Sequence, residues 1–125
     1  MSIENTMMSI ENSENNEIQE FVCANCGSVH PIDEVAYQDG QIVSKTLAQN
    51  AHVSLTLFAF EQGEEISTHE SGGDAFVTCL DGTGRITIDG VEYLLHEGES
   101  IVMPARHPHA VFGQERFKML LVVVF

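Results

Sequence analysis

The chain has 125 residues, a length that suits one domain with one hydrophobic core. Its 19 acidic and five basic side chains give a formal net charge of -14 and would repel nucleic-acid phosphates and an anionic membrane surface, so we expect neither as a partner. The sequence has no apolar run of about eighteen residues that could span a bilayer and lacks the basic and apolar start of a secretory signal, so we expect a cytoplasmic protein.

Residues 1–20 are predicted to form an acidic tail. The sequence Met-Ser-Ile-Glu-Asn occurs in it twice, and the tail contains neither Lys nor Arg. Its few apolar side chains cannot bury enough surface to offset the entropy that is lost on ordering. We expect this segment to be disordered or loosely helical.

Residues 21–40 are predicted to form an irregular connector that carries two cysteines. Cys23 and Cys26 have the spacing with which two thiolates bind one Zn²⁺, Gly27 allows the tight turn, and His30 is a candidate third ligand. Such a site needs a further ligand from the rest of the chain or from another subunit. Reduced free thiols are the alternative, because an odd total of three cysteines suits a reducing compartment.

Residues 41–125 are predicted to be all-β. Short β-branched and aromatic segments alternate there with Gly, Asp and Asn, and helical periodicity is almost absent. Asp89-Gly90 between two such segments is typical of a type I′ hairpin turn. Eight or nine strands are expected, at residues 42–47, 51–60, 65–69, 75–80, 86–88, 91–93, 99–103, 109–112 and 117–125. Without crossover helices, these strands favour an antiparallel barrel or jelly roll.

The last predicted strand, 117–125, is apolar on both faces. One face can fill the interior of the barrel, and the other needs cover from another sheet or a second subunit. We therefore expect a homodimer.

Two motifs fall on these strands. Residues 63–82 resemble the first cupin motif, in which Gly63, His69 and Gly82 match, while Ser71 stands at the position of the second His and Ala75 at that of the Glu. Residues 98–113 resemble the second cupin motif, in which Gly98, Pro104 and His109 match, while Arg106 replaces a Gly and Gly113 replaces an Asn.

The chain thus resembles a small single-domain cupin over residues 41–125. The resemblance implies a barrel of six to eight strands, usually dimeric, with a divalent metal held in the pocket by three His and one Glu. Family activities include dioxygenases, isomerases and decarboxylases as well as sugar sensors and non-catalytic seed proteins, so the fold alone fixes little about the substrate.

The residues themselves also indicate a His-based site. His107 and His109 share a face if the chain stays extended through Pro108, and these strands can bring them to His69. Asp74 is a candidate carboxylate, and such a set suits Fe, Mn, Ni or Zn. The alternative is a binding barrel that has lost its metal, because Ser71 is a poor metal ligand.

The expected ligand pocket lies beside these residues. Ser71, Ala75, Val77 and Cys79 are placed there, and Cys79 is expected to behave as a small buried hydrophobe. Arg106 and Arg116 are candidates for meeting a carboxylate at the pocket mouth, although solvent exposure is the simpler expectation. His52 and His96 are interpreted as surface or packing residues.

Three functions are compatible with this reading. The first, which requires least, is a small-molecule-binding cupin with an optional metal. The second is a metal-dependent enzyme of the dioxygenase or isomerase type that acts on a small polar metabolite, for which the catalytic residues are unknown and Glu65 and Glu70 are the nearest acid–base candidates. Strand parity turns Glu70 away from His69. The third is an assembly protein that uses the apolar last strand and the cysteine segment.

Overall fold

The computed structural model describes residues 22–23 and 27–125, the first two by their backbone alone. The acidic tail predicted at residues 1–20 lies outside these residues. Within the described part, no helix has the length and apolar character that crossing a membrane requires.

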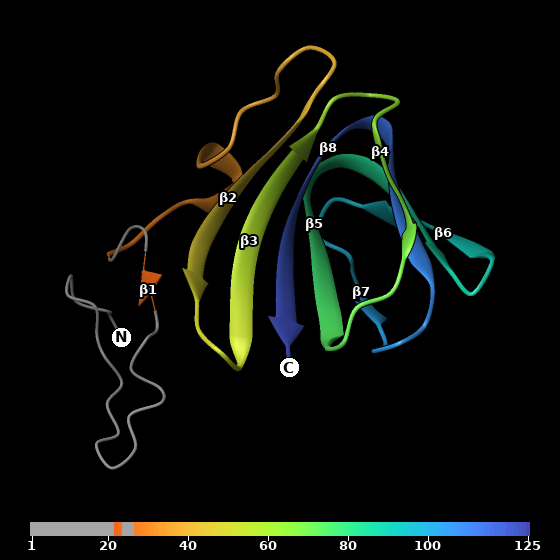
Figure 1. Ribbon diagram of the computed structural model, residues 1–125. Helices are drawn as coiled ribbons and strands as arrows, with labels where there is room; N and C mark the ends of the chain where they lie inside the picture. The colour runs from red at the N-terminus through yellow and green to blue at the C-terminus, as the bar shows by residue number, and fades with distance from the viewer. Residues whose placement is uncertain (1–21, 24–26) are drawn as a thin grey trace.

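The described residues form eight strands and one short 3-10 turn (Figure 1). In chain order these are β1 (Val22–Cys23), η1 (Pro31–Asp33), β2 (Ile42–Gln49), β3 (Val53–Phe60), β4 (Glu65–His69), β5 (Asp74–Ile88), β6 (Val91–His96), β7 (Ser100–Met103) and β8 (His109–Val124). The strands pair antiparallel in the order β1-β2-β3-β8-β5-β6, with β4 also on β8 and β7 also on β5. The predicted all-β antiparallel barrel is confirmed.

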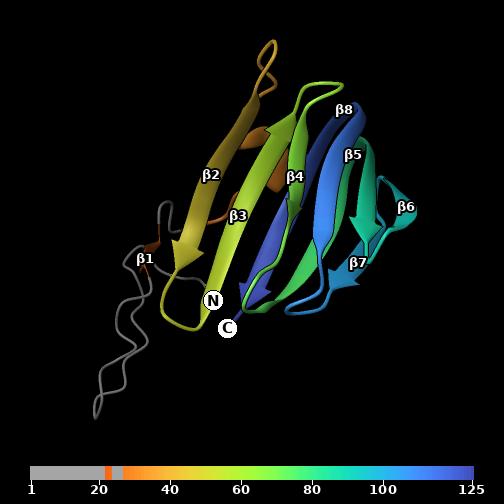
Figure 2. The same ribbon diagram turned by 45° about the vertical axis from the view of Figure 1, so that its right-hand side comes forward.

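The two long strands close the barrel. One half of β8 pairs with β3 and the other half with β4, while β5 pairs with β7 in its first half and with β6 in its second. β5 and β8 also pair with each other along most of their length. Because each long strand changes partners halfway, the sheet folds over on itself, and Figure 2 shows β4 in front of the sheet of β3, β8 and β5.

Several strand boundaries differ from those expected. The predicted strands 75–80 and 86–88 are one strand, β5, because Asp81-Gly82-Thr83-Gly84 forms bulges against β8 instead of a turn. The predicted strands 109–112 and 117–125 likewise form the single strand β8. By contrast, the strand 65–69 and the Asp89-Gly90 turn are confirmed, since Asp89 and Gly90 have φ values of 52° and 81°.

The barrel interior is filled by apolar side chains from β3, β5, β6, β7 and β8. The main cluster of buried residues consists of Phe60, Ala75, Val77, Cys79, Ile86, Leu95, Met103, Val111, Phe117, Met119 and Val123. In β3 the alternation sends Phe58 and Phe60 to this cluster and Leu57 and Ala59 to the opposite face. The opposite face is therefore apolar as well and needs cover of its own.

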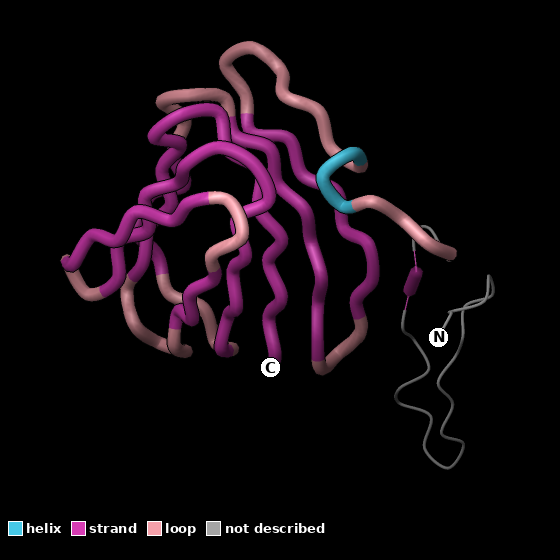
Figure 3. Tube along the Cα trace, turned by 180° about the vertical axis from the view of Figure 1, so that it is seen from behind, coloured by secondary structure: helices cyan, strands magenta, loops and turns pink. Residues whose placement is uncertain are grey.

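The connector supplies part of that cover. Val35 is buried against Leu57 and Ala59, and Tyr37 and Leu120 pack beside them. In Figure 3 the segment with η1 crosses the outer side of the sheet. The connector of this chain thus covers part of the outer face. Another sheet or a second subunit is not needed to cover this region.

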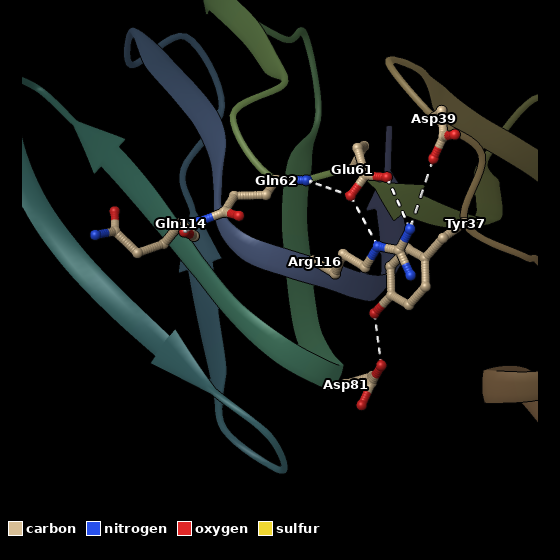
Figure 4. Close-up of polar contacts among 7 residues, drawn as sticks. All are labelled: Tyr37, Asp39, Glu61, Gln62, Asp81, Gln114 and Arg116. Atoms are coloured by element: carbon tan, nitrogen blue, oxygen red, sulfur yellow. Dashed lines mark hydrogen bonds and ion pairs between the residues drawn. The ribbon is translucent and has the colours of Figure 1, made fainter.

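Polar contacts fasten the connector to the barrel (Figure 4). The hydroxyl of Tyr37 donates to Asp81 at 2.5 Å. Arg116 donates through Nε and Nη2 to the two carboxylate oxygens of Glu61, at 2.8 and 3.0 Å, and lies 3.7 Å from Asp39. The hydrogen bond from Arg116 lowers the pKa of Glu61 to about 2. Arg116 is consequently engaged on the outside of the barrel.

Candidate functional site

A cavity of about 310 Å³ lies inside the barrel. Its wall comes from strands that are far apart in the sequence, because β3, β4, β5, β7 and β8 surround one interior. The lining residues are Phe58, Ile66, His69, Glu70, Ser71, Ala75, Met103, His109, Val111, Met119, Leu121 and Val123. Most of the wall is apolar, and its polar groups are two imidazoles, one hydroxyl and one carboxyl.

The two imidazoles belong to His69 and His109, which are directly opposite each other in the pairing of β4 with β8. Cross-strand neighbours project from the same face of a sheet, which brings the side chains together. Their Nε2 atoms are 3.2 Å apart, and the ring centroids are 4.4 Å apart at an interplanar angle of 70°. His109 is almost fully buried, whereas His69 is exposed.

Backbone contacts indicate that Nδ1 of each ring carries a proton. Nδ1 of His69 lies 2.9 Å from the carbonyl oxygen of Ser67, and Nδ1 of His109 lies 3.2 Å from that of His107. A carbonyl oxygen only accepts, so each Nδ1 carries the proton and donates it. In a ring that carries this one proton, the lone pair is on Nε2, and the two Nε2 atoms face each other.

This arrangement places two acceptors in contact. Burial lowers the pKa of His109, and the neighbouring His69 lowers it further, so both effects favour the neutral ring. Two Nε2 lone pairs at 3.2 Å repel each other, whereas a proton between the two nitrogens or a cation near both makes the contact favourable. Backbone hydrogen bonds to Nδ1 that leave Nε2 free are also the usual support of metal-bound histidines.

The pair fits two adjacent positions around a divalent ion. Nitrogens that each lie about 2.1 Å from one ion are about 3.0–3.4 Å apart at octahedral or tetrahedral angles, and the observed separation is 3.2 Å. In the described residues, however, no group of three or more His, Cys, Asp or Glu side chains is placed to hold a metal. An ion at His69 and His109 would thus have two protein ligands and several positions for other donors.

A sequence model of the cupin domain matches residues 56–125. The chain belongs to the cupin family. A Streptococcus pyogenes protein of unknown function, SPY1581, is 40% identical over 96% of each chain, with a TM-score of 0.77. Comparison with curated protein sequences gave no match.

Two further solved structures are similar to this cupin. A cupin 2 conserved barrel domain protein from Leptotrichia buccalis is 46% identical, with 73% of this chain and 44% of that chain covered and a TM-score of 0.72. A cupin superfamily protein from Desulfitobacterium hafniense is 34% identical, with 73% and 84% covered and a TM-score of 0.71. Salicylate 1,2-dioxygenase from Pseudoaminobacter salicylatoxidans shares the fold at 14% identity, with 66% of this chain and 26% of that chain covered and a TM-score of 0.62.

Two of the proposed metal ligands of this cupin do not reach the histidine pair. His107 lies outside β8 and its Nδ1 is 2.6 Å from Asp89, because the chain turns at residues 104–107 instead of staying extended. Arg106 in this turn has a φ of +66°, a conformation that explains the Gly of the cupin motif at this position. Asp74 accepts a hydrogen bond from the amide of Ala105 at 2.8 Å and does not line the cavity.

The predicted pocket residues divide into two groups. Ser71 and Ala75 line the cavity, whereas Val77 and Cys79 are buried in the core beyond it. All of them except Ser71 are on β5, and the two later positions lie deeper along the strand, where the side chains of β6 and β8 fill the interior. Cys79 is a buried small hydrophobe, as expected, and burial raises the pKa of its thiol to about 11.

Cys79 should therefore be unreactive in the folded protein. In a Cys23→Ser/Cys26→Ser variant it is the one remaining thiol, and we expect no labelling by iodoacetamide at neutral pH within the time that labels a free cysteine completely. Mass spectrometry after denaturation should then show full labelling. Rapid labelling of the folded variant would show that Cys79 is accessible and would contradict its burial.

The other candidates are surface groups or lie outside the described residues. His52 and His96 are exposed, as expected, and His96 contacts Glu99 at 3.2 Å. His30 is exposed, but Cys26 and the side chain of Cys23 are not described, so the zinc site at the cysteine pair stays a prediction.

Sequence reasoning missed most of the cavity wall. Phe58 and Met119 line it, yet the strands that carry them are apolar on both faces, so alternation alone could not tell which face is inside. Glu70 also lines the cavity, although parity turned it outward, because it follows the last residue of β4 and strand parity no longer applies. Ile66 and His69 both line the cavity because the register of β4 against β8 shifts between them, which simple alternation does not predict.

Proposed function

We propose that this cupin binds a small molecule inside the barrel, with the polar end of the ligand at His69 and His109. The observation that carries the proposal is the cavity of about 310 Å³, which combines a mainly apolar wall with two imidazoles at one place. Small-molecule sites have this character, since apolar side chains bury the ligand and a few polar groups orient it. We likewise propose that the protein is cytoplasmic and that its thiols are reduced.

A cavity-filling substitution tests this function. Ala75 lines the cavity, and Ala75→Leu adds three carbon atoms to its wall. Wild-type protein dialysed against a metabolite extract should retain small molecules that mass spectrometry detects, and Ala75→Leu should retain at least tenfold less. Overpacking costs about 1–3 kcal/mol of stability, so a thermal melt must show that the variant is folded.

Phe76→Leu is the matched control, because residue 76 is next to Ala75 on β5 but is exposed on the outer face. This variant should retain the same molecules as wild type. Equal retention by folded Ala75→Leu would show that the cavity is not the binding site and would overturn the proposal.

A metal-dependent cupin enzyme is the second candidate function, and one specific observation favours it: the two free Nε2 atoms converge at 3.2 Å. His69 and His109 would hold the ion, which when bound supplies a Lewis acid. The apolar wall would orient the substrate and exclude water, while Glu70 at the cavity is the nearest group that can carry a proton. This function needs an ion at the pair, whereas the first does not.

We also propose that the protein forms a homodimer through the outer face of the barrel. Phe76 and Val102 are cross-strand neighbours and are 44% and 53% exposed, and Val122 and Val124 continue the same face on β8. These four residues, the outer apolar patch, lie beyond the part that Val35 covers. A continuous apolar patch of this kind is typical of a protein–protein contact.

Val102→Glu should disrupt this contact, because it places a charge in the apolar patch of both copies. Light scattering after gel filtration should give twice the 13.8 kDa chain mass for wild type and the chain mass for the variant. Val91→Glu is the control, since Val91 is equally exposed, at 52%, but belongs to β6. A monomeric wild type, or a dimer that survives Val102→Glu, would contradict the proposed interface.

A further inference from the structure

We infer that the ligand is an uncharged, mostly apolar molecule of about one ring that carries a hydroxyl group for the histidine pair. The inference rests on the proposed binding of a small molecule in the cavity and names its chemical class. The cavity of about 310 Å³ lies near the lower limit of the volumes of small-molecule sites. Such a volume suits one substituted ring.

The composition of the wall excludes a strongly polar ligand. Eight of the twelve lining residues are apolar, namely Phe58, Ile66, Ala75, Met103, Val111, Met119, Leu121 and Val123. A polyol would leave most of its hydroxyl groups against these side chains without hydrogen-bond partners, and each buried hydroxyl without a partner weakens binding. Ser71 can serve only one of them: its Oγ accepts a hydrogen bond from the amide of Gly73 and keeps its O–H as a single donor.

The charges exclude an anionic ligand. Of the five Lys and Arg residues, all of which are described, none lines the cavity. Four are engaged elsewhere: Lys45 with Glu34, Arg85 over the ring of Phe112, Arg116 with Glu61, and Lys118 with the carbonyl of Ile32. The fifth, Arg106, is exposed. The carboxyl of Glu70 and the net charge of -14 add to the repulsion of an anion.

The histidine pair selects the polar end of the ligand. Because both Nδ1 atoms contact backbone carbonyls, the ring nitrogens left for a ligand are the two Nε2 atoms of His69 and His109, and each accepts a hydrogen bond in the Nδ1–H tautomer. A ligand carbonyl or ether oxygen would add a third acceptor, whereas a hydroxyl can donate to one Nε2 and reduce the repulsion of the pair. A phenol or a small cyclic alcohol meets this requirement and matches the apolar wall.

Methionine methyl groups report directly on the cavity. Met103 and Met119 line it, while the other three methionines, Met1, Met7 and Met8, belong to the acidic tail and serve as internal references. We propose to titrate methyl-¹³C-methionine protein with phenol, toluene, benzoate and glucose in the presence of EDTA, so that no metal contributes. Phenol should shift both cavity resonances saturably, toluene should bind at least tenfold more weakly, and benzoate and glucose should cause no shift.

Two variants connect the shifts to the residues. Ala75→Leu should abolish the response to phenol, because it fills the cavity. His69→Ala should remove the tenfold preference for phenol over toluene, since it removes an acceptor at an exposed position. The same phenol affinity in wild type and folded His69→Ala would overturn the role of the pair.

The outcomes separate the ligand class from the proposed function. Tighter binding of benzoate than of phenol, lost in Arg106→Gln, would replace the class by an anion and leave a binding cavity in place. Saturable shifts with glucose would likewise overturn the apolar class alone. Absence of any response from Met103 and Met119 overturns the class as well, and the dialysis experiment with Ala75→Leu then decides whether the cavity binds another kind of molecule.

Discussion

Replacing Gly82 with Ala is expected to destabilise the barrel by about 3 kcal/mol or more. Gly82 has a φ of +75°, which an L side chain adopts only at a cost of about 1–2 kcal/mol. A Cβ at this position would also lie 1.6 Å from the carbonyl oxygen of Arg116, and this obstacle is backbone. The close approach occurs at the bulge where β5 passes β8, so the two longest strands would have to separate.

Thermal unfolding measures this effect. For a domain of about 100 residues, a loss of 3 kcal/mol lowers the melting temperature by roughly 12–24 °C. Gly98→Ala is the matched control, because Gly98 has a φ of +86° but no atom lies within 4 Å of the added Cβ. It should lose only about 1–2 kcal/mol, the cost of the backbone conformation. Equal losses in the two variants would show that the contact with Arg116 does not matter.

This glycine also shows what the sequence could and could not predict about the fold. Alternation and the Asp89-Gly90 turn predicted strands and a hairpin correctly, since both depend on neighbours in the sequence. Asp81-Gly82-Thr83-Gly84 has the composition of a turn, yet β5 continues through it. The reason is a contact with Arg116 and Phe117, more than thirty residues away, which no local pattern contains.

The candidate site was predictable to a similar extent. The spacing of the two cupin motifs identified His69 and His109. The pairing of β4 with β8 then places their side chains on the same face of the sheet. His107 was expected beside them from parity, but Arg106 adopts a left-handed φ and the chain turns. Asp74 was chosen for its carboxylate, and that carboxylate instead binds the amide of Ala105. The sequence does not show which side chains accept hydrogen bonds from nearby backbone amides, because this depends on how the loops fold.

The residues of the cavity wall can be predicted only when it is known which face of the sheet lies inside the barrel. β3 and β8 are apolar on each face, so the sequence predicted a buried sheet without telling which face encloses the cavity. The structure resolves this through the connector, because Val35 covers Leu57 and Ala59 on the outside and leaves Phe58 to the inside. The outer cover thus indirectly determines the chemistry of the interior.

Adding Mn²⁺, Ni²⁺ or Zn²⁺ is expected to stabilise the protein through His69 and His109. An ion at one hundred times its dissociation constant raises the free energy of unfolding by about 2.7 kcal/mol. His69→Ala and His109→Ala should each weaken ion binding at least 100-fold and abolish this stabilisation, because each leaves one protein ligand in the described part of the chain. The Cys23→Ser/Cys26→Ser background removes ion binding at the cysteine pair from the measurement.

The controls follow from the geometry. His107→Ala should bind the ion as well as wild type, since the side chain contacts Asp89 and lies away from the pair. His69 is exposed, so His69→Ala should fold normally, whereas His109 is buried and its variant must first be shown to unfold cooperatively. Stabilisation that persists in His69→Ala would place the ion elsewhere. No stabilisation of wild type by any of the three ions would remove the enzyme candidate and leave the binding of a small molecule at His69 and His109 as the proposed function.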